Sequence, residues 1–307
     1  MASRPPRVSI GMAVYNDEKF LRPALDSLLA QDYADFELII SDNASTDATE
    51  AIGREYAARD SRIRYHRNAT NIGACENFNK VFRLSSGGEY FMWAGGHDVW
   101  APTYLSRCVE ALESDRTLVQ CNSVAQYMSQ DGKEFTGVMR QIDTRRYGVF
   151  VRASLILWQA STFLIYSVYR ASALRRPRPL WQGTTAPDLF LGFEISLLGP
   201  TAIIPEPLYF MRDNRGEQAR PITRAQGSAM FRERMYGRST VSGEGFWRRN
   251  LEWWHVLKGA PLSYGMRIAV MGSAISTCVL KLYPYVPSVF RRAMRGLVGR
   301  CFHAPHN

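Results

Sequence analysis

The stretch Tyr90–Trp100 reads YFMWAGGHDVW, and the rest of the chain is organised around it. Four apolar or aromatic residues in a row predict a buried strand, which the glycine pair at 95–96 ends. Glycines let a backbone approach a ligand closely, and a carboxylate such as Asp98 at the carboxyl end of a strand lies where open α/β sheets bind ligands. An Asp here can also cap an ordinary turn, so this stretch alone does not decide between a binding site and a turn.

Strands and helices alternate upstream of this stretch. Arg7–Asn16 and Phe36–Ser41 are apolar runs typical of buried strands, and apolar residues at helical spacing follow each of them. A short strand at Ile63–Tyr65, a loop at residues 71–73 and a helix ending at Leu84 lead into the Tyr90 strand. Alternation with short connections predicts a mostly parallel, doubly wound α/β sheet flanked by helices.

The pattern downstream is more mixed. We expect a helix at Thr103–Glu113, a hairpin around Asp131-Gly132 between strands Val124–Met128 and Glu134–Val138, a helix at Gly148–Trp158, a strand at Ser161–Tyr169, a helix at Pro187–Leu198, and strand pieces at Ala202–Pro205 and Leu208–Met211. A polar, Arg-rich loop then precedes aromatic-rich helices. We therefore predict an α/β domain over residues 1–212 and a basic helical extension over residues 213–307.

Charge is distributed unevenly along the 307 residues. The formal net charge is +10, and residues 212–307 hold sixteen Lys/Arg against five Asp/Glu. A basic segment interleaved with Trp and Phe fits an anionic membrane surface, and no nucleic-acid motif accompanies it. A helical cap over the sheet edge is the plainer alternative. We expect an anionic membrane surface as a partner, and no nucleic acid.

The cysteines and the apolar segments of the sequence indicate where in the cell the protein is expected. The five cysteines show no paired spacing, which is typical of reduced thiols, and the N-terminus carries no apolar signal segment. The longest apolar run, Ile268–Leu280, is too short to span a bilayer. These features predict a cytoplasmic protein that docks peripherally on the inner face of the cytoplasmic membrane.

Common cofactor motifs are missing from this chain. The first strand lacks GxGxxG, no GxxxxGK[ST] is present, and neither HExxH nor a Cys/His cluster marks a zinc site. Polar clusters instead follow several strands, at Tyr15-Asn16, Asp42–Asp47, Asn71–Gly73 and His97-Asp98. Because parallel strands deliver their carboxyl ends to one edge, we expect these clusters to meet there.

The combination of these motifs resembles family 2 glycosyltransferases of the GT-A fold. The similar segments are VSIGMAVYN, SDNASTD, NIG and GHDVW, spread over Val8 to Arg212. The resemblance implies a Rossmann-like sheet and an inverting transfer of a sugar from a nucleotide-sugar donor to an acceptor hydroxyl, with Mg²⁺ or Mn²⁺. It also implies a glycan or lipid-linked acceptor, as in the synthesis of bacterial cell-surface polysaccharide or glycolipid.

The resemblance also implies roles for single residues. Tyr15 would face the base, Asp42 would hold the base or ribose edge, and Asn71 and Gly73 would neighbour the diphosphate. Asn16 and His97 would also belong to the nucleotide-sugar site, and Asp98 would ligate the metal. Gly96 departs from the family pattern, because an acidic residue or His is more usual there. This departure puts the strength of metal binding in question and leaves the nucleotide site standing.

The reaction needs a general base for the acceptor hydroxyl. Asp188 opens a helix where the family carries its catalytic carboxylate, and Glu194 is the second candidate for this role. Arg212 could reach the diphosphate through its guanidinium fork, and Asn214 is a weaker metal-ligand candidate. Two other functions stay open: a catalytically impaired nucleotide-sugar or glycan-binding module and, with less support, a sugar-phosphate nucleotidylyltransferase, whose Gly-rich first loop is missing here.

Overall fold

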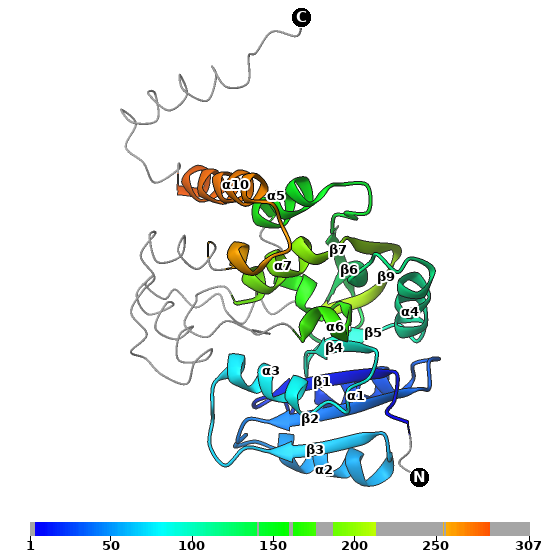
Figure 1. Cartoon of the computed structure of the whole chain (residues 1–307). Coiled ribbons are helices and arrows are strands. Elements are labelled where there is room, and N and C mark those ends of the chain that lie inside the picture. Colours follow the sequence, from blue (N-terminus) through cyan, green and yellow to red (C-terminus); the bar gives the residue numbers. More distant parts are fainter. Residues whose placement is uncertain are drawn as a thin grey trace, which may run out of the picture.

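The computed structural model describes residues 4–139, 141–159, 162–175, 187–212, 254 and 256–282 (Figure 1). One mixed sheet of nine strands runs through them, in the order β3-β2-β1-β4-β8-β6-β9-β5, with β7 paired to β6. The strands are β1 Val8–Val14, β2 Phe36–Asp42, β3 Ile63–Arg67, β4 Tyr90–Ala94, β5 Val99–Trp100, β6 Gln120–Met128, β7 Phe135–Met139, β8 Val168–Arg170 and β9 Thr201–Arg212.

The first four strands form the parallel half of the sheet. β1 lies between β2 and β4, and β3 lies outside β2, with every pair parallel. The register pairs Val14 with Asp42, and Asp42 with Arg67, so the carboxyl ends of β1, β2 and β3 lie side by side. The predicted doubly wound α/β arrangement is thus confirmed, and its carboxyl edge collects the polar clusters that follow these strands.

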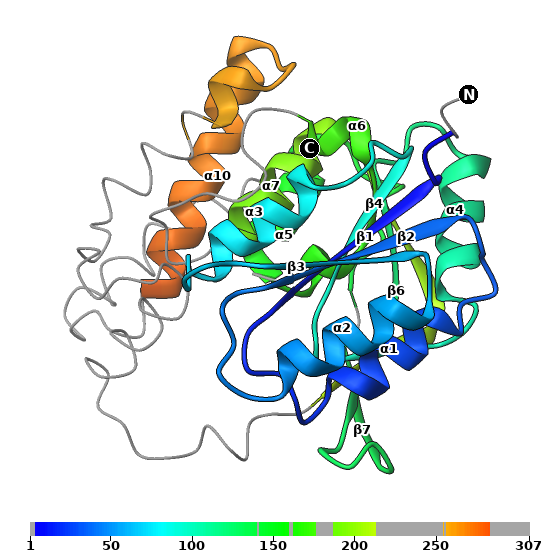
Figure 2. The ribbon, with the colours of Figure 1, turned by 90° about the horizontal axis from the view of Figure 1, so that it is seen from below.

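Helices cover both faces of the sheet (Figure 2). One face packs against α1 Leu21–Leu29, α2 Thr49–Arg59 and α4 Tyr104–Ser114; the other packs against α3 Ala74–Arg83, the 3₁₀ helix η1 Thr162–Tyr166, α6 Ala171–Leu174 and α7 Pro187–Leu198. A further layer joins α7 to α5 Val149–Gln159 and α10 Tyr264–Leu282. Among the described residues, no helix is both long and apolar enough to cross a membrane.

Side-chain alternation explains why the central strands are buried on both faces. In β4, Tyr90 and Met92 join the core under α1 and α4, whereas Phe91 and Trp93 join the core under α3 and α7. Gly11 in β1 is required for space, because a Cβ there would come within 2.7 Å of Val81 on α3. Such close helix packing fixes the position of α3 on the sheet.

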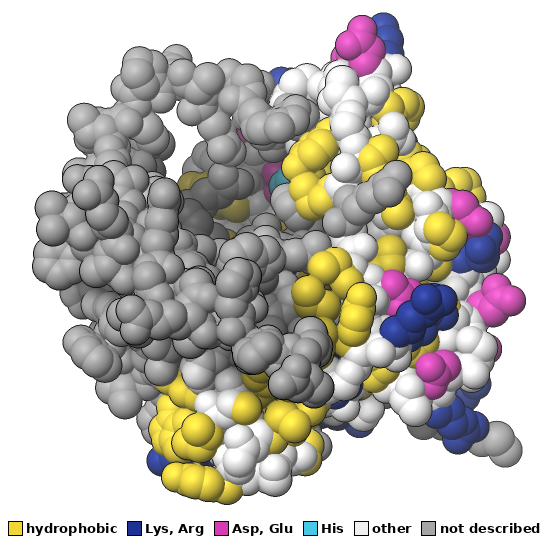
Figure 3. Space-filling model, turned by 90° about the horizontal axis from the view of Figure 1, so that it is seen from above, with side chains coloured by type: hydrophobic (Ala, Val, Ile, Leu, Met, Phe, Trp, Pro, Cys, Tyr) yellow, Lys and Arg dark blue, Asp and Glu magenta, His cyan; other side chains and the backbone are white. Residues whose placement is uncertain are grey.

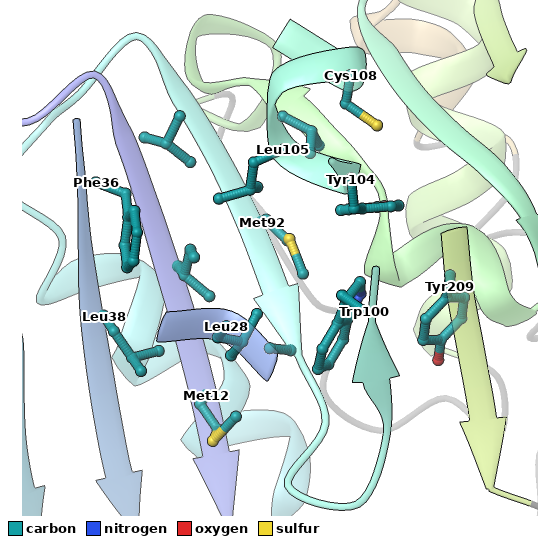
Figure 4. Packing of buried hydrophobic residues seen from close by; sticks show 14 of the residues in the cluster. Met12, Leu28, Phe36, Leu38, Met92, Trp100, Tyr104, Leu105, Cys108 and Tyr209 are labelled. Carbon is teal, nitrogen blue, oxygen red and sulfur yellow. The ribbon is translucent and has the colours of Figure 1, made fainter. Parts of the chain in front are cut away.

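The mixed half of the sheet joins this core through aromatic side chains. Trp100 on β5 stacks on Tyr209 on β9, with ring centroids 5.6 Å apart and planes at 19° (Figure 4). Both residues are almost fully buried. Trp100 therefore packs in the core, and its ring has no exposed face on which a sugar could stack.

Three sequence-based expectations need correction. The strand expected at Ser161–Tyr169 is instead η1 followed by the short β8, since an apolar run of this length has no period that separates strand from helix. The two expected pieces after residue 200 form one long strand, β9, with register shifts against β6. The two-residue strand β5 was not expected, because so short a segment carries no periodic signal.

The other elements agree with the sequence-based expectations. The helices expected at Gly148–Trp158 and Pro187–Leu198 are α5 and α7, and the expected hairpin is β6–β7. Residues 213–253, which include Asn214 and the expected Arg-rich loop, lie outside the described residues. The domain boundary at residue 212 stays a prediction.

Candidate active site

The loop after β1 brings Tyr15 and Asn16 to the carboxyl edge of the sheet. Tyr15 is 45% exposed, the state expected of a ring that offers a free face to a base. Asn16 adopts the left-handed conformation (φ 53°), and its Oδ1 accepts the backbone N–H of Thr46 at 2.8 Å. The Asn16 backbone N–H donates to Ser45 Oγ at 3.0 Å. Asn16 therefore joins the loops after β1 and β2 and holds Tyr15 in place.

Asp42 ends β2 and is fully buried. Its Oδ1 accepts the Ser45 backbone N–H at 2.8 Å, and its Oδ2 accepts the Tyr65 hydroxyl at 2.6 Å and Arg67 Nη1 at 3.3 Å. Burial and the Asp42 charge raise the pKa of Tyr65, so Tyr65 keeps the proton that it donates. The structure gives Asp42 a positioning task in the turn at residues 42–45, and its direct contact with a donor stays a prediction.

An asparagine network fixes the loop at residues 71–73. Asn71 Oδ1 accepts Asn43 Nδ2 at 2.8 Å and the Gly73 N–H at 2.9 Å, and Asn43 Oδ1 accepts the Ile72 N–H at 2.9 Å. Gly73 has φ 81°, which favours glycine, and α3 begins directly after it. A helix N-terminus attracts anions. The loop thus places the start of α3, with Asn71 and Gly73, beside the ends of β2 and β3.

His97 and Asp98 lie in the turn between β4 and β5. Asp98 is 1% exposed, and its carboxylate accepts the Tyr209 hydroxyl at 2.6 Å and the Arg212 backbone N–H at 3.0 Å. The His97 ring lies between two carboxylates, with Nδ1 3.8 Å from Asp17 Oδ1 and Nε2 3.9 Å from Asp98 Oδ1. The turn therefore gathers acidic oxygens and an imidazole next to the loop after β1.

Arg212 closes β9 and is 6% exposed. Its guanidinium donates to the carbonyl oxygens of His97 at 3.0 Å, Ser129 at 3.2 Å, and Gln130, and it lies 4.3 Å from the centre of the Phe20 ring. These contacts tie the β6–β7 hairpin to the His97-Asp98 turn. Arg212 thus braces the site in this structure, and its contact with a diphosphate stays a prediction.

Asp188 lies in the first turn of α7 and accepts the Leu189 N–H at 2.9 Å. Burial raises its pKa, and the hydrogen bond from Leu189 offsets part of this effect. Burial together with the negative charge of Asp188 raises the pKa of the Cys75 thiol to about 12, which puts the carboxylate near the first turn of α3. Glu194 is six residues along α7, where 100° per residue turns its side chain well away from that of Asp188.

The structure thus brings the expected residues of the first four strands to one edge, with Asp188 near the start of α3. It adds three residues that sequence reasoning did not select: Asp17 next to His97, Asn43 within the asparagine network, and Tyr209 on Asp98. Asn43 stands inside the quoted motif SDNASTD and Asp17 directly follows VSIGMAVYN, so their positions were a usable signal. Tyr209 is 111 residues from Asp98, and nothing local points to it.

The fold and this edge together define an open α/β protein with polar groups gathered at the carboxyl ends of its parallel strands, and comparison with known proteins identifies its family. The family profile described as glycosyl transferase family 2 matches residues 9–171, which is more than half of the chain. The chain belongs to glycosyl transferase family 2.

A relative and two solved structures illustrate the similarity. WcaA of Escherichia coli (strain K12), named for a glycosyl transferase of colanic acid biosynthesis, is 37% identical over 101 residues, which are 33% of this chain and 36% of WcaA. The structure of S. aureus TarS 1–349 with UDP-GlcNAc has a TM-score of 0.62 at 16% identity and covers 88% of this chain and 72% of that one. The structure of the mannosyltransferase PcManGT from Pyrobaculum calidifontis, in complex with GDP-Man and Mn²⁺, has a TM-score of 0.52 at 16% identity. The match covers 98% of this chain and 81% of PcManGT.

These likenesses differ in what they support. The two solved structures are distant in sequence, so they show the GT-A fold alone. The matched segments span roughly two fifths of the lengths of the curated relatives, at 40%, 46% and 36% for three of them. The chain is therefore matched to these relatives over only part of their length.

Proposed function

We propose that this chain is an inverting glycosyltransferase, which moves a sugar from a nucleotide-sugar donor to an acceptor hydroxyl. The observation that carries the proposal is a half-buried carboxylate with a raised pKa, Asp188, whose charge acts on Cys75 in the first turn of α3. Helix α3 begins just after the loop at Asn71 and Gly73, beside the ends of β2 and β3. Family membership supports glycosyl transfer, and inversion is part of the proposal.

The strand ends suit the nucleotide part of a donor. The exposed ring of Tyr15 offers a stacking face for the base, held by the bonds of Asn16. The loop at Asn71 and Gly73 leads into α3, whose N-terminal backbone N–H groups favour a diphosphate. The donor would therefore lie across the ends of β1 to β3, with its diphosphate toward α3 and its sugar toward Asp188.

Asp188 is our proposed general base. It would take the proton of the acceptor hydroxyl while that oxygen attacks the anomeric carbon and the bond from this carbon to the diphosphate breaks. A single displacement of this kind inverts the anomeric configuration. The raised pKa of Asp188 favours proton capture, because a stronger base takes a hydroxyl proton more readily. Glu194 is the weaker alternative for the general base, because its side chain extends from α7 in a different direction from that of Asp188.

A divalent cation is the proposed cofactor. Bound Mg²⁺ or Mn²⁺ would neutralise the charge of the leaving diphosphate. Within the described residues, no group of three or more His, Cys, Asp or Glu side chains is arranged to hold a metal. Such cations are commonly held by one or two carboxylates, with phosphates and water supplying the other ligands. The Asp98 carboxylate beside His97 fits that smaller demand, because each of its oxygens keeps a second acceptor position.

A donor panel tests the proposal. The chain would be incubated with UDP-, GDP- and dTDP-sugars, with Mn²⁺ or with EDTA, and release of nucleoside diphosphate measured. We expect release from one donor class, increased by Mn²⁺ and by the correct acceptor, and lost in Asp188→Asn. Tight donor binding without release would favour the binding module. Formation of a nucleotide-sugar from a sugar phosphate and a nucleoside triphosphate would favour the nucleotidylyltransferase.

We further propose a glycan or lipid-linked acceptor at a membrane surface, as the name of WcaA supports for the glycan. Seen from the end that carries α5 and α10, the surface shows several groups of apolar side chains (Figure 3). Large apolar side chains on these helices and before α5 are exposed, namely Tyr147, Phe150, Val151, Tyr264 and Ile268. The basic Arg145, Arg146 and Lys258 are exposed nearby in the sequence. Such mixtures are typical of interfacial helices.

Vesicle flotation tests the membrane contact. We expect the chain to float with vesicles that contain anionic lipid and to dissociate as salt rises, because the Debye length falls from ~10 Å at 0.1 M to ~3 Å at 1 M. Flotation that does not depend on anionic lipid, or tight binding to single-stranded nucleic acid instead, would contradict the contact and leave the transferase proposal intact.

A further inference from the structure

The side-chain amide of Asn71 forms the exposed end of the asparagine network, and its partners fix the direction in which it points. Asn71 Oδ1 accepts Asn43 Nδ2 at 2.8 Å and the Gly73 N–H at 2.9 Å, which uses both of its acceptor positions. Asn43 and Gly73 are buried, whereas Asn71 is exposed. The carbonyl side of the Asn71 amide therefore faces the protein, and its NH₂ side is left for a partner outside.

The same direction continues inward as far as Lys80 on α3. Asn43 Oδ1 accepts Asn68 Nδ2 at 3.0 Å and the Ile72 N–H at 2.9 Å. Asn68 Oδ1 in turn accepts Lys80 Nζ at 2.5 Å. Asn43 and Asn68 are 3% and 5% exposed, so these bonds are shielded from water. Each amide of this series, Lys80–Asn68–Asn43–Asn71, thus accepts on the side of Lys80 and donates on the side of Asn71.

Three groups that can only donate hold the series in this direction. The Lys80 ammonium and the backbone N–H groups of Ile72 and Gly73 each meet an amide oxygen, and none of the three can accept a hydrogen bond. Turning an amide round would set its NH₂ group against one of these donors. Both groups would then lack a partner, which is costly where they are buried.

The outward end of the series is a pair of N–H donors on an exposed loop. Within the part of the chain that the structure describes, Asn71 Nδ2 has no hydrogen-bond partner. The positive charge of Lys80 at the inner end polarises the bonds in one sense, since hydrogen bonds in a row strengthen one another. Such a pair is complementary to an acceptor oxygen and has the wrong polarity for a metal ion.

We propose that the series presents the Asn71 N–H pair to an acceptor oxygen of the donor nucleotide, on its diphosphate or on its nucleoside. The inference rests on the proposed function, because that function places the donor across the strand ends beside this loop. Asn71 touches the nucleotide, whereas Asn43, Asn68 and Lys80 are positioning residues that fix the direction of its amide.

Asn71→Asp tests the direction, because it keeps the inward contacts and reverses the outward one. A carboxylate still accepts Asn43 Nδ2 and the Gly73 N–H, and its charge strengthens both bonds. Its other oxygen is an acceptor where the nucleotide needs a donor. Isothermal titration calorimetry of the full chain with UDP, GDP and dTDP, in the presence of Mn²⁺, measures the affinity. We expect it to fall about 10-fold or more, while the midpoint of urea unfolding stays equal or rises.

Thr70→Asp is the matched control. It adds the same charge at the adjacent exposed position, outside the series, so it should change the affinity far less than Asn71→Asp. Asn43→Asp tests the positioning role, because its carboxylate cannot donate to Asn71 Oδ1. The Asn71 amide then loses the bond that directs it, so affinity should fall although the substituted residue does not touch the nucleotide. Lys80→Met should weaken binding as well, and Lys80→Arg, which again can only donate, should retain it.

Uridine and guanosine separate the two sources of the acceptor oxygen. A loss in Asn71→Asp that is confined to the diphosphates places the contact on phosphate, and an equal loss with the nucleoside places it on the nucleoside. Either result supports the proposed contact.

The outcomes also separate this inference from the proposed function. Native affinity in Asn71→Asp, or a loss no larger than that of Thr70→Asp, overturns the inference even if sugar transfer is found. An Asn71→Asp variant that loses stability together with affinity overturns it as well, because its inward bonds would then have been broken. A native chain that binds none of the nucleotides also overturns it. Nucleotide binding that depends on Asn71, in a chain that transfers no sugar, supports the contact and contradicts the transferase proposal.

Discussion

Replacing Tyr209 by Phe isolates the contact that holds the Asp98 carboxylate. The Tyr209 hydroxyl donates to Asp98 Oδ2 at 2.6 Å, and Tyr209 and Asp98 are 0% and 1% exposed. Burial and the Asp98 charge raise the pKa of Tyr209, so the hydroxyl stays protonated and able to donate. Phe keeps the ring that stacks on Trp100, and only the hydrogen bond is lost.

The size of the effect follows from the charge and the burial. A hydrogen bond to a charged group contributes about 1.5–3 kcal/mol to stability. Because the Asp98 carboxylate is buried, no water molecule would replace the hydroxyl that Phe lacks. We therefore expect Tyr209→Phe to lower the free energy of unfolding by about 1.5–3 kcal/mol. Urea titration followed by circular dichroism measures this change. Affinity for Mn²⁺ with UDP or GDP should fall too, since Asp98 is then held only by the Arg212 N–H.

Tyr90→Phe is the matched control. Tyr90 is also 1% exposed in the same sheet, but its hydroxyl makes no hydrogen bond of good geometry, although Glu89 is nearby. Removing an unpaired buried hydroxyl should leave stability unchanged or raise it. If Tyr209→Phe and Tyr90→Phe lose the same stability, or if neither the stability nor the Mn²⁺ affinity of Tyr209→Phe changes, the reasoning about Asp98 is refuted.

Two further predictions concern Asp188 and Ala44. Asp188→Asn should abolish sugar transfer, leave donor affinity nearly unchanged, and stabilise the fold at neutral pH. Because the folded pKa is raised, the folded chain holds this proton to higher pH than the unfolded chain, so native stability falls as pH rises past the ordinary Asp value. Melting curves from pH 4 to 8 should show the variant gaining relative stability as pH rises, and a constant difference would contradict the assignment. Ala44 is left-handed at φ 62°, so Ala44→Gly should stabilise the chain by about 0.5–1 kcal/mol in urea titration, and a loss of stability would exclude strain there.

Much of the parallel half of the fold could be predicted, because its signals are local. Apolar runs in β1 and β2, each followed by helical spacing, specify strand–helix units that pack as parallel strands. The parallel topology then brings the residues after each strand to one edge, which is why Tyr15, Asn71 and Asp98 could be grouped before their positions were known. The mixed half was harder to predict, because η1 and β8 share one apolar run and β5 is two residues long.

The sequence by itself determined the class of fold, the family and the edge at which the polar clusters gather, because periodicity and motif order are properties of neighbouring residues. Tertiary structure alone decided which groups surround each carboxylate at this edge. Asp42 is enclosed by Tyr65 and Arg67, Asp98 is bound by Tyr209, and Asp17 fills the space beside Gly96. Burial and hydrogen-bond partners arise from residues 23 to 111 positions apart meeting in the folded chain, and no local pattern carries that information.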